Sequence, residues 1–233
     1  MAQPDEARTV LATLRPQPYS KGSSSHVVDP IVEPLWPGLR VLAAVDDAGA
    51  VLADEEGDPV ADHERVVIAL GVSIRAGSLI LDGTVTKQIL RDEGAMYTAG
   101  LEEVPTVGSS IGRMFFGRHR ARVEERIAEA ETAAANRVFH PDELVTFVAT
   151  DLLWLDGESL LDVPLLERKR VLESVLIDGE VIRVGMFVRP PIEHWGASWR
   201  AQGFAAMTMK SANSHYSPGV ATKDWTITSL PRR

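Results

Sequence analysis

Cysteine is absent from the 233 residues of the chain. This absence excludes disulfide bonds, thiolate metal sites and cysteine nucleophiles. Long hydrophobic runs are absent as well: no apolar segment approaches the ~20 residues of a membrane-spanning helix, and the N-terminus lacks the apolar core of a signal peptide. We therefore expect a protein that is neither exported nor inserted in a membrane, and we expect it in the cytoplasm.

Positive charge is scarce. The formal net charge is -9 at pH 7 and the sequence pI is about 5.2, whereas proteins that grip a polyanion usually cluster Lys and Arg. The scarcity is uneven, because the segment from Arg189 to Arg233 has six basic residues and two acidic ones, and residues 113–122 contain four arginines and no acid. These segments indicate either local basic faces or ordinary solvated surface.

The order of apolar and polar residues predicts the first elements of a globular domain. Residues 1–28 lack sustained periodicity and contain a Ser-Ser-Ser run, so we expect a flexible N-terminal lead-in before one domain over residues 29–233. Residues 39–54 predict an antiparallel hairpin, residues 63–72 a helix and residues 78–86 a strand.

Two later segments have clear helical or strand character. Residues 117–137 are rich in Ala, Glu and Arg, which predicts a long helix. Its apolar stripe is thin, so this helix is either a solvated surface element or a partner-binding one. Residues 147–155 predict a buried strand that ends at the turn Asp156-Gly157, and a helix with one buried face is expected from Leu165.

Three stretches of the chain carry a recognisable motif pattern. They are Val-Glu-Pro-Leu-Trp-Pro-Gly-Leu-Arg at 32–40, VTFVATDLLWLDGESLLDVPLLERKRVL at 145–172 and GFAAMTMKSANSHYSPGVATKDW at 203–225. In this order they resemble the nucleotidyltransferase (adenylation) domain of bacterial ATP-dependent DNA ligases. The resemblance implies an α+β fold in which two mostly antiparallel β-sheets, flanked by helices, enclose a cleft. Active ligases of the family continue into an oligonucleotide-binding (OB) fold, and since the sequence ends soon after the last motif we expect no C-terminal OB-fold.

The first motif of the family runs Glu-Pro-Lys-x-Asp-Gly-x-Arg, and its lysine attacks the α-phosphate of ATP to form lysyl-AMP. In this sequence the lysine position is Leu35 and the aspartate position is Pro37. Covalent catalysis needs an activated nucleophile, which a leucine side chain cannot provide. A shifted alignment does not restore it, because Lys21, Lys87 and Lys169 are not followed by Asp-Gly at the required spacing.

The later motifs have lost reactive groups too. The lost positions are Thr84 (family glutamate), Thr150 (aromatic residue that stacks on adenine), Ala205 (family glutamate) and Ile227 (family lysine). Mg²⁺ prefers carboxylate oxygens, and the acids expected at positions 37, 84 and 205 are missing together. The family uses ATP and Mg²⁺; for this chain we expect no cofactor and no metal site.

Three polar residues of the motifs remain: Glu33, Arg40 and Lys210. In the family the glutamate contacts the adenine edge, the arginine lies near the ribose and the lysine closes the fourth motif. Either these residues are a nucleotide- or phosphate-binding remnant, or Glu33 and Arg40 form a structural ion pair across neighbouring strands. Asp82 and Asp151, which flank the motif strands, are expected to fix turns rather than to act as bases.

Apolar residues at the motifs raise the question of whether the nucleotide cleft is filled. Leu35, Met207, Met209 and Ile227 stand at or beside positions where the family has polar groups. They either occupy part of the cleft or pack beneath one that is still open.

The leading hypothesis from the sequence is a catalytically inactive ATP-dependent DNA ligase-like protein with a binding or scaffolding role in DNA repair. Its partner would be DNA or a DNA-repair protein. Two alternatives remain open: a non-catalytic adenosine-nucleotide sensor that uses Glu33 and Arg40, and an active DNA ligase or nucleotidyltransferase with a rearranged site. Resemblance of fold alone does not decide among them.

Overall fold

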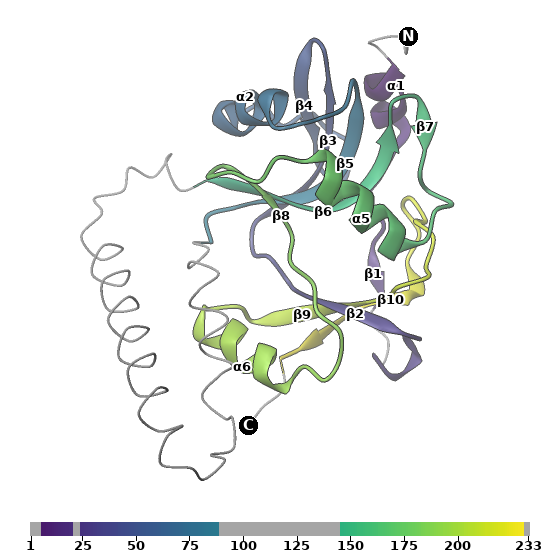
Figure 1. Ribbon diagram of the computed structural model, residues 1–233, viewed down its shortest axis with the longest axis vertical. Coiled ribbons are helices and arrows are strands. Elements are labelled where there is room, and N and C mark those ends of the chain that lie inside the picture. Colours follow the sequence, from purple (N-terminus) through teal and green to yellow (C-terminus); the bar gives the residue numbers. More distant parts are fainter. Residues whose placement is uncertain (1–5, 21–23, 89–144, 231–233) are drawn as a thin grey trace, which may run out of the picture.

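The computed structural model describes residues 6–20, 24–88 and 145–230. In this part of the chain two β-sheets lie one above the other, with helices around them (Figure 1). The predicted helix over residues 117–137 lies outside the described residues. None of the described helices is long and apolar enough to span a membrane.

The larger sheet is built around two long antiparallel strands, β5 (Leu79–Thr86) and β6 (Thr146–Leu155). Its strand order is β4-β3-β5-β6-β7, and β8 pairs with β6 in parallel. The bounds of these other strands are Leu39–Asp46 for β3, Gly49–Ala53 for β4, Glu158–Ser159 for β7 and Ile182–Val184 for β8. Every residue of β5 is buried, since helices or the second sheet cover both faces of this strand.

Three helices cover the larger sheet. They are α1 (Glu6–Thr13), α2 (Glu64–Val72) and α5 (Leu165–Val175). Strand alternation sends neighbouring side chains of β5 to opposite faces: Leu81 packs in the core shared with α2 and α5, whereas Ile80 packs in the core shared with α1. Each helix forms here because its apolar residues recur at helical spacing and bury one stripe, such as Leu165 and Leu172 of α5.

The smaller sheet has the strand order β1-β10-β9-β2. Its strands are β1 (Tyr19–Ser20), β2 (Pro30–Pro34), β9 (Ala206–Ser211) and β10 (Thr222–Ser229), and a short 3-10 turn, η1 (Ser24–His26), precedes β2. Helix α6 (Glu193–Ala201) covers its outer face with the buried Trp199. The inner face of the sheet is turned toward the larger sheet (Figure 1). The first motif, residues 33–40, connects β2 of the smaller sheet to β3 of the larger one.

The predicted flexible lead-in over residues 1–28 is wrong for residues 6–20. Ala7 and Leu11 of α1 are buried against the larger sheet. Gln17 is fully buried and forms hydrogen bonds through both its backbone and its side chain. Its backbone N–H donates to Tyr216 Oη, and its backbone carbonyl accepts from Arg40. Its side-chain Nε2 donates to a threonine hydroxyl, and its Oε1 accepts from a backbone N–H. The proline and serine content of residues 1–28 suggested flexibility, but residues 6–20 are ordered by such polar contacts.

The helices and strands predicted within the described residues from residue 39 onward are confirmed. The hairpin appears as β3 and β4, the helix over 63–72 as α2, the strand over 78–86 as β5, and the strand and helix after residue 147 as β6 and α5. The fold is α+β with mostly antiparallel sheets, as expected, and the described residues form these two sheets without an OB barrel.

Candidate functional site

The first motif forms the connection from β2 to β3. The backbone N–H of Leu35 donates to Ala206 O at 3.0 Å, and its partly buried side chain is hydrocarbon. Thr86 Oγ1 donates to Pro37 O at 2.6 Å. Gly38 has φ +142°, and a Cβ there would lie 2.2 Å from Val85 O. The glycine of the motif is therefore required by the close approach of two strands, with or without chemistry at the neighbouring positions.

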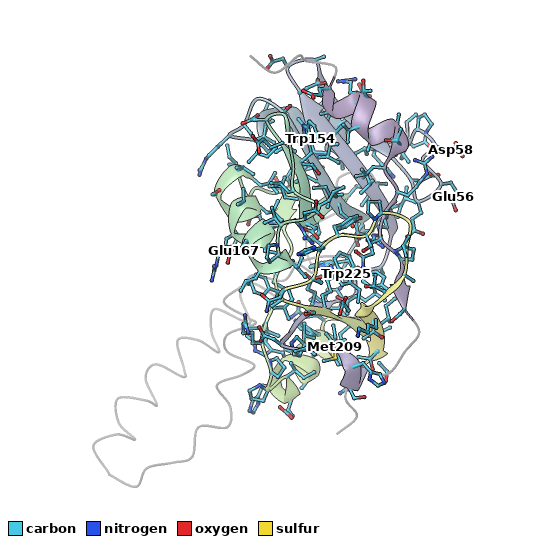
Figure 2. All side chains as sticks on the ribbon, turned by 90° about the vertical axis from the view of Figure 1, so that its right-hand side faces the viewer. Glu56, Asp58, Trp154, Glu167, Met209 and Trp225 are labelled. Atoms are coloured by element: carbon cyan, nitrogen blue, oxygen red, sulfur yellow. The ribbon has the colours of Figure 1, made fainter. Side chains whose placement is uncertain are left out.

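The inner face of the smaller sheet carries two of the three remnant residues, Glu33 and Lys210. Cross-strand register places Glu33 beside Thr208, and Lys210 beside Trp225. Figure 2 shows Trp225 at mid-height in the molecule, between Trp154 of the larger sheet and Met209 of the smaller one. The remnant residues thus face the larger sheet, where the site was expected.

Glu33 is bound by two lysines. Lys169 of α5 contacts Glu33 Oε1, and Lys210 Nζ lies 2.8 Å from Glu33 Oε2. Lys169 Nζ also donates to Thr150 O at 2.8 Å. Both contacts to Glu33 are ion pairs. We call Glu33, Lys169 and Lys210, all almost completely buried, the Glu33 cluster.

The electrostatics of the Glu33 cluster favour its charged form. Burial would raise the pKa of Glu33, but Lys169 and Lys210 outweigh burial and lower it from 4.5 to about 2. Burial would lower the pKa of Lys210, but Glu33 raises it. The Lys210 ammonium also lies 4.3 Å from the Trp225 ring centroid, a cation–π distance. The cluster therefore holds one carboxylate against two ammonium groups.

Arg40 does not pair with Glu33, which corrects one of the two sequence-based alternatives. It forms a two-pronged ion pair with Asp82 of β5, at 3.0 and 2.6 Å. Tyr216 Oη donates to the same carboxylate at 2.8 Å. Burial would lower the pKa of Arg40, but Asp82 raises it. Arg40 thus forms an ion pair across neighbouring strands, with Asp82 and not Glu33 as its partner.

Asp82 and Asp151 do not fix turns, contrary to prediction. They are neighbours in the register of β5 and β6, and each binds an arginine in the interior. Arg168 of α5 donates to both oxygens of Asp151 at 2.8 and 2.7 Å, and both side chains are fully buried. Two adjacent buried carboxylates are therefore neutralised by two separate arginines.

The side chains at the lost motif positions supply no reactive group. Thr84 and Thr150 are buried, and Thr150 Oγ1 donates to Asp82 O at 3.2 Å. Ala205 and Pro37 are exposed. Among the described residues no three His, Asp or Glu side chains are grouped as a metal site.

Two of the four apolar residues that were considered as cleft fillers point elsewhere. Met207 and Met209 lie on the outer face of the smaller sheet, where they pack with Trp199 under α6. Ile227 shares the inner face with Thr208 but is 39% exposed. These methionines therefore point away from the face that carries Glu33 and Lys210.

Lys169 and Arg168, which pair with Glu33 and Asp151, were not predicted as site residues. A signal was present: Leu165, Arg168, Lys169 and Leu172 follow the i, i+3, i+4, i+7 spacing of one buried helix face. Two basic residues within a buried stripe need carboxylate partners. The helix pattern alone could have predicted a buried ion pair, although not its partners.

The comparisons with known proteins agree on one family. No protein-family model matches the chain. A DNA ligase of Natronomonas pharaonis is 28% identical over 194 residues, which cover 83% of this chain and 31% of that protein. A DNA ligase of Thermococcus onnurineus is 25% identical over 183 residues, 77% of this chain and 30% of that protein. The chain thus spans about a third of the length of these curated relatives.

Solved structures show the same fold. The ligase domain of M. tuberculosis LigD superposes with a TM-score of 0.61 at 22% identity, covering 94% of this chain and 60% of that one. The ATP-dependent DNA ligase of bacteriophage T7, in complex with ATP, gives a TM-score of 0.55 at 11% identity, with 94% and 69% covered. The resemblance inferred from the motifs is confirmed: the chain is similar in sequence to DNA ligases, and its fold is that of the ligase domains in these structures.

Proposed function

We propose that this chain is a ligase-like domain that does not transfer an adenylyl group and that acts in the cytoplasm by binding. One observation carries the proposal. The lysine position of the first motif holds Leu35, while the polar residues that survive beside it, Glu33 and Lys210, are engaged with each other and with Lys169.

Adenylyl transfer to a side chain needs a nucleophile with a free lone pair. Leu35 has none. The amines of Lys169 and Lys210 are both buried in ion pairs with Glu33. The raised pKa of Lys210 keeps its amine protonated, which removes the lone pair that an attack on phosphorus requires. These features support an inactive site.

Stabilisation of the phosphates is also weakened. The positions of the family's acids and of one phosphate-binding lysine hold Thr84, Ala205 and Ile227. Loss of a single fixed donor typically costs about 100- to 1000-fold in rate, and such losses are not additive when the groups act together. Restoring one residue alone is therefore expected to recover little activity.

The partner in this proposal is DNA or a DNA-repair protein. The curated relatives are DNA ligases, and a structural neighbour with a TM-score of 0.52 and 10% identity is described under the words "DNA binding with a minimal scaffold". The net charge of -9 predicts few phosphate contacts. A mobility-shift assay on nicked DNA over a salt series tests this arm, since each phosphate contact adds to the salt dependence.

Incubation with labelled ATP and Mg²⁺, followed by denaturing electrophoresis, tests the inactive site. The expected result is no labelled protein band. A band that survives denaturation would show a covalent adenylate and would support the remaining alternative, an active nucleotidyltransferase with a rearranged site. A bona fide ATP-dependent ligase in the same assay is the positive control.

Binding of adenosine nucleotide without chemistry is a second candidate. It is favoured by the excess of positive charge in the Glu33 cluster, where two ammonium groups face one carboxylate. Calorimetric titration with ATP and with AMP tests it, together with the variants Lys210→Met and Arg40→Ala. Heat that is lost in Lys210→Met would support a nucleotide sensor, and absence of heat in the unaltered protein would exclude it.

A further inference from the structure

Helix α2 has an apolar outer face. Residues 66–72, Val-Val-Ile-Ala-Leu-Gly-Val, contain no polar side chain. Val66 and Leu70 are buried on the inner face, whereas Ile68 is 63% and Val72 77% exposed. A helix that is apolar all round is normally covered on all sides. In the part of the chain that the structure describes, nothing covers the outer face of α2.

A third apolar residue adjoins this face. The N–H of Ile177, just after α5, donates to Ser73 O at the end of α2 at 2.7 Å, and Ile177 is 39% exposed. Single exposed apolar residues are common on protein surfaces, but here Ile68 and Val72 lie one helical turn apart with Ile177 beside the same helix end. We call Ile68, Val72 and Ile177 the α2 surface. Helix α2 lies at an outer edge of the molecule (Figure 1).

Opposite charges stand at the two ends of the α2 surface. Glu64 is the first residue of α2, and Arg75 follows its last turn; both are exposed. They stand at opposite ends of α2, whose nine residues span roughly 13 Å at helical rise, which is too far for a pair within the chain. Neither side chain has an ion-pair partner among the described residues.

This charge pattern fits a second copy of the chain. If two α2 helices pack antiparallel about a twofold axis, Glu64 of each copy comes opposite Arg75 of the other, and the same contact is made twice. The apolar residues between the charges then cover one another. Gly71, on the exposed side of the helix, lets the two helices approach closely.

We propose that the α2 surface mediates self-association of the chain into a twofold-symmetric dimer with antiparallel α2 helices. The surface is one short helix and one adjoining residue, so the contact is small and the dimer forms only at high protein concentration. This inference is independent of whether the ligase-like site is active.

The apolar part of the contact is tested by sedimentation velocity over a wide range of protein concentration. The unaltered protein is expected to shift from monomer to dimer as its concentration rises. The double variant Ile68→Glu with Val72→Glu should weaken the dimer at least about tenfold, because charge is buried at the centre of the contact. Val28→Glu is the matched control: Val28 is 74% exposed, precedes β2 of the other sheet, and should leave the dimer unchanged.

The antiparallel arrangement is tested by charge reversal. Glu64→Arg and Arg75→Glu should each weaken self-association, since each places like charges opposite one another. An equal mixture of the two variants should form a heterodimer, because both of its contacts are again between opposite charges. The control Lys223→Glu reverses an exposed charge on β10 and should neither weaken the dimer nor complement another variant.

Three results would overturn the proposal. The first is a protein that stays monomeric at every concentration. The second is a dimer that the α2 variants leave intact, which would place the contact elsewhere. The third is a monomer in which the amides of residues 66–72 are strongly protected from hydrogen exchange and the α2 variants abolish this protection, which would mean that another segment of the same chain covers α2.

Discussion

Lys169 of α5 and Glu33 of β2 form an ion pair that joins the two sheets. The same ammonium donates to Thr150 O of β6, so a single side chain contacts both halves of the fold. Glu33 is a residue that the ligase motif marks, whereas Lys169 is not marked by it. The polar remnant of the motif therefore has a structural role that can be measured without any ligand.

Removal of Glu33 should cost more stability than removal of Lys169. Glu33→Gln leaves two buried ammonium groups without a carboxylate, and breaking a buried pair in this way typically costs about 3–5 kcal/mol. Lys169→Met leaves Glu33 paired with Lys210 and should cost less. Urea denaturation of both variants measures the free energies of unfolding.

The matched control for this pair is Arg170→Met on the same helix. Arg170 pairs with Glu167 on the surface, with its side chain 62% exposed, and exposed pairs contribute about 0–1 kcal/mol. If Lys169→Met proved as costly as Glu33→Gln, the account of the cluster as one carboxylate shared by two lysines would be wrong.

Acid should destabilise the protein partly through Glu33. Its pKa is lowered from 4.5 to about 2 in the folded protein, so its stabilisation is complete above pH 4.5 and is lost as the pH falls toward 2. A shift of this size corresponds to roughly 3 kcal/mol. Denaturation curves between pH 2 and 7 should show a smaller loss in Glu33→Gln than in the unaltered protein. Equal slopes in both proteins would contradict the lowered pKa.

Gln17 should matter although it lies in a segment whose composition suggests flexibility. Gln17→Ala removes two side-chain hydrogen bonds, to Thr222 Oγ1 at 3.1 Å and from the Ser217 N–H at 2.7 Å. Loss of buried partners should cost about 1–3 kcal/mol. Thr13→Ala, at the exposed end of α1, should change the free energy of unfolding by less than about 0.5 kcal/mol. A neutral Gln17→Ala would show that the side-chain hydrogen bonds of Gln17 do not stabilise the domain.

Gly38 should tolerate alanine less well than Gly49. Both have positive φ, +142° and +107°, but a Cβ at Gly38 would lie 2.2 Å from Val85 O while one at Gly49 meets nothing within 4 Å. Gly49→Ala should therefore lose stability only through backbone strain, on the order of 1–3 kcal/mol. Gly38→Ala should lose more, because the clash with Val85 O adds to this strain. Thermal unfolding compares the two variants; equal losses would mean that the β2–β3 connection does not need its glycine.

The sequence was sufficient to predict the framework. Apolar periodicity placed β3, β4, α2, β5, β6 and α5 close to their observed bounds, because these elements bury continuous stripes whose spacing is local. The motif resemblance assigned Glu33 and Lys210 to one site, and cross-strand register brings both to the inner face of the smaller sheet.

The partners of the charged residues could not be predicted from the sequence. One of the two alternatives paired Glu33 with Arg40, but Lys169 of α5 pairs with Glu33, and Asp82 of β5 pairs with Arg40. Such choices depend on which strand faces which helix, and spacing within a segment carries no information about this. The direction in which Met207 and Met209 point could not be predicted either, because the face to which a strand residue points is determined by the register of the strand.

The most direct test of the central claim is the intact mass of the protein after incubation with ATP and Mg²⁺, measured for the unaltered chain and for Leu35→Lys with Pro37→Asp. We expect no adduct on the unaltered chain, because Leu35 supplies no nucleophile and the buried amines of Lys169 and Lys210 are engaged with Glu33. An added adenylyl mass on the unaltered chain, lost on acid treatment as a phosphoramidate would be, would contradict the account.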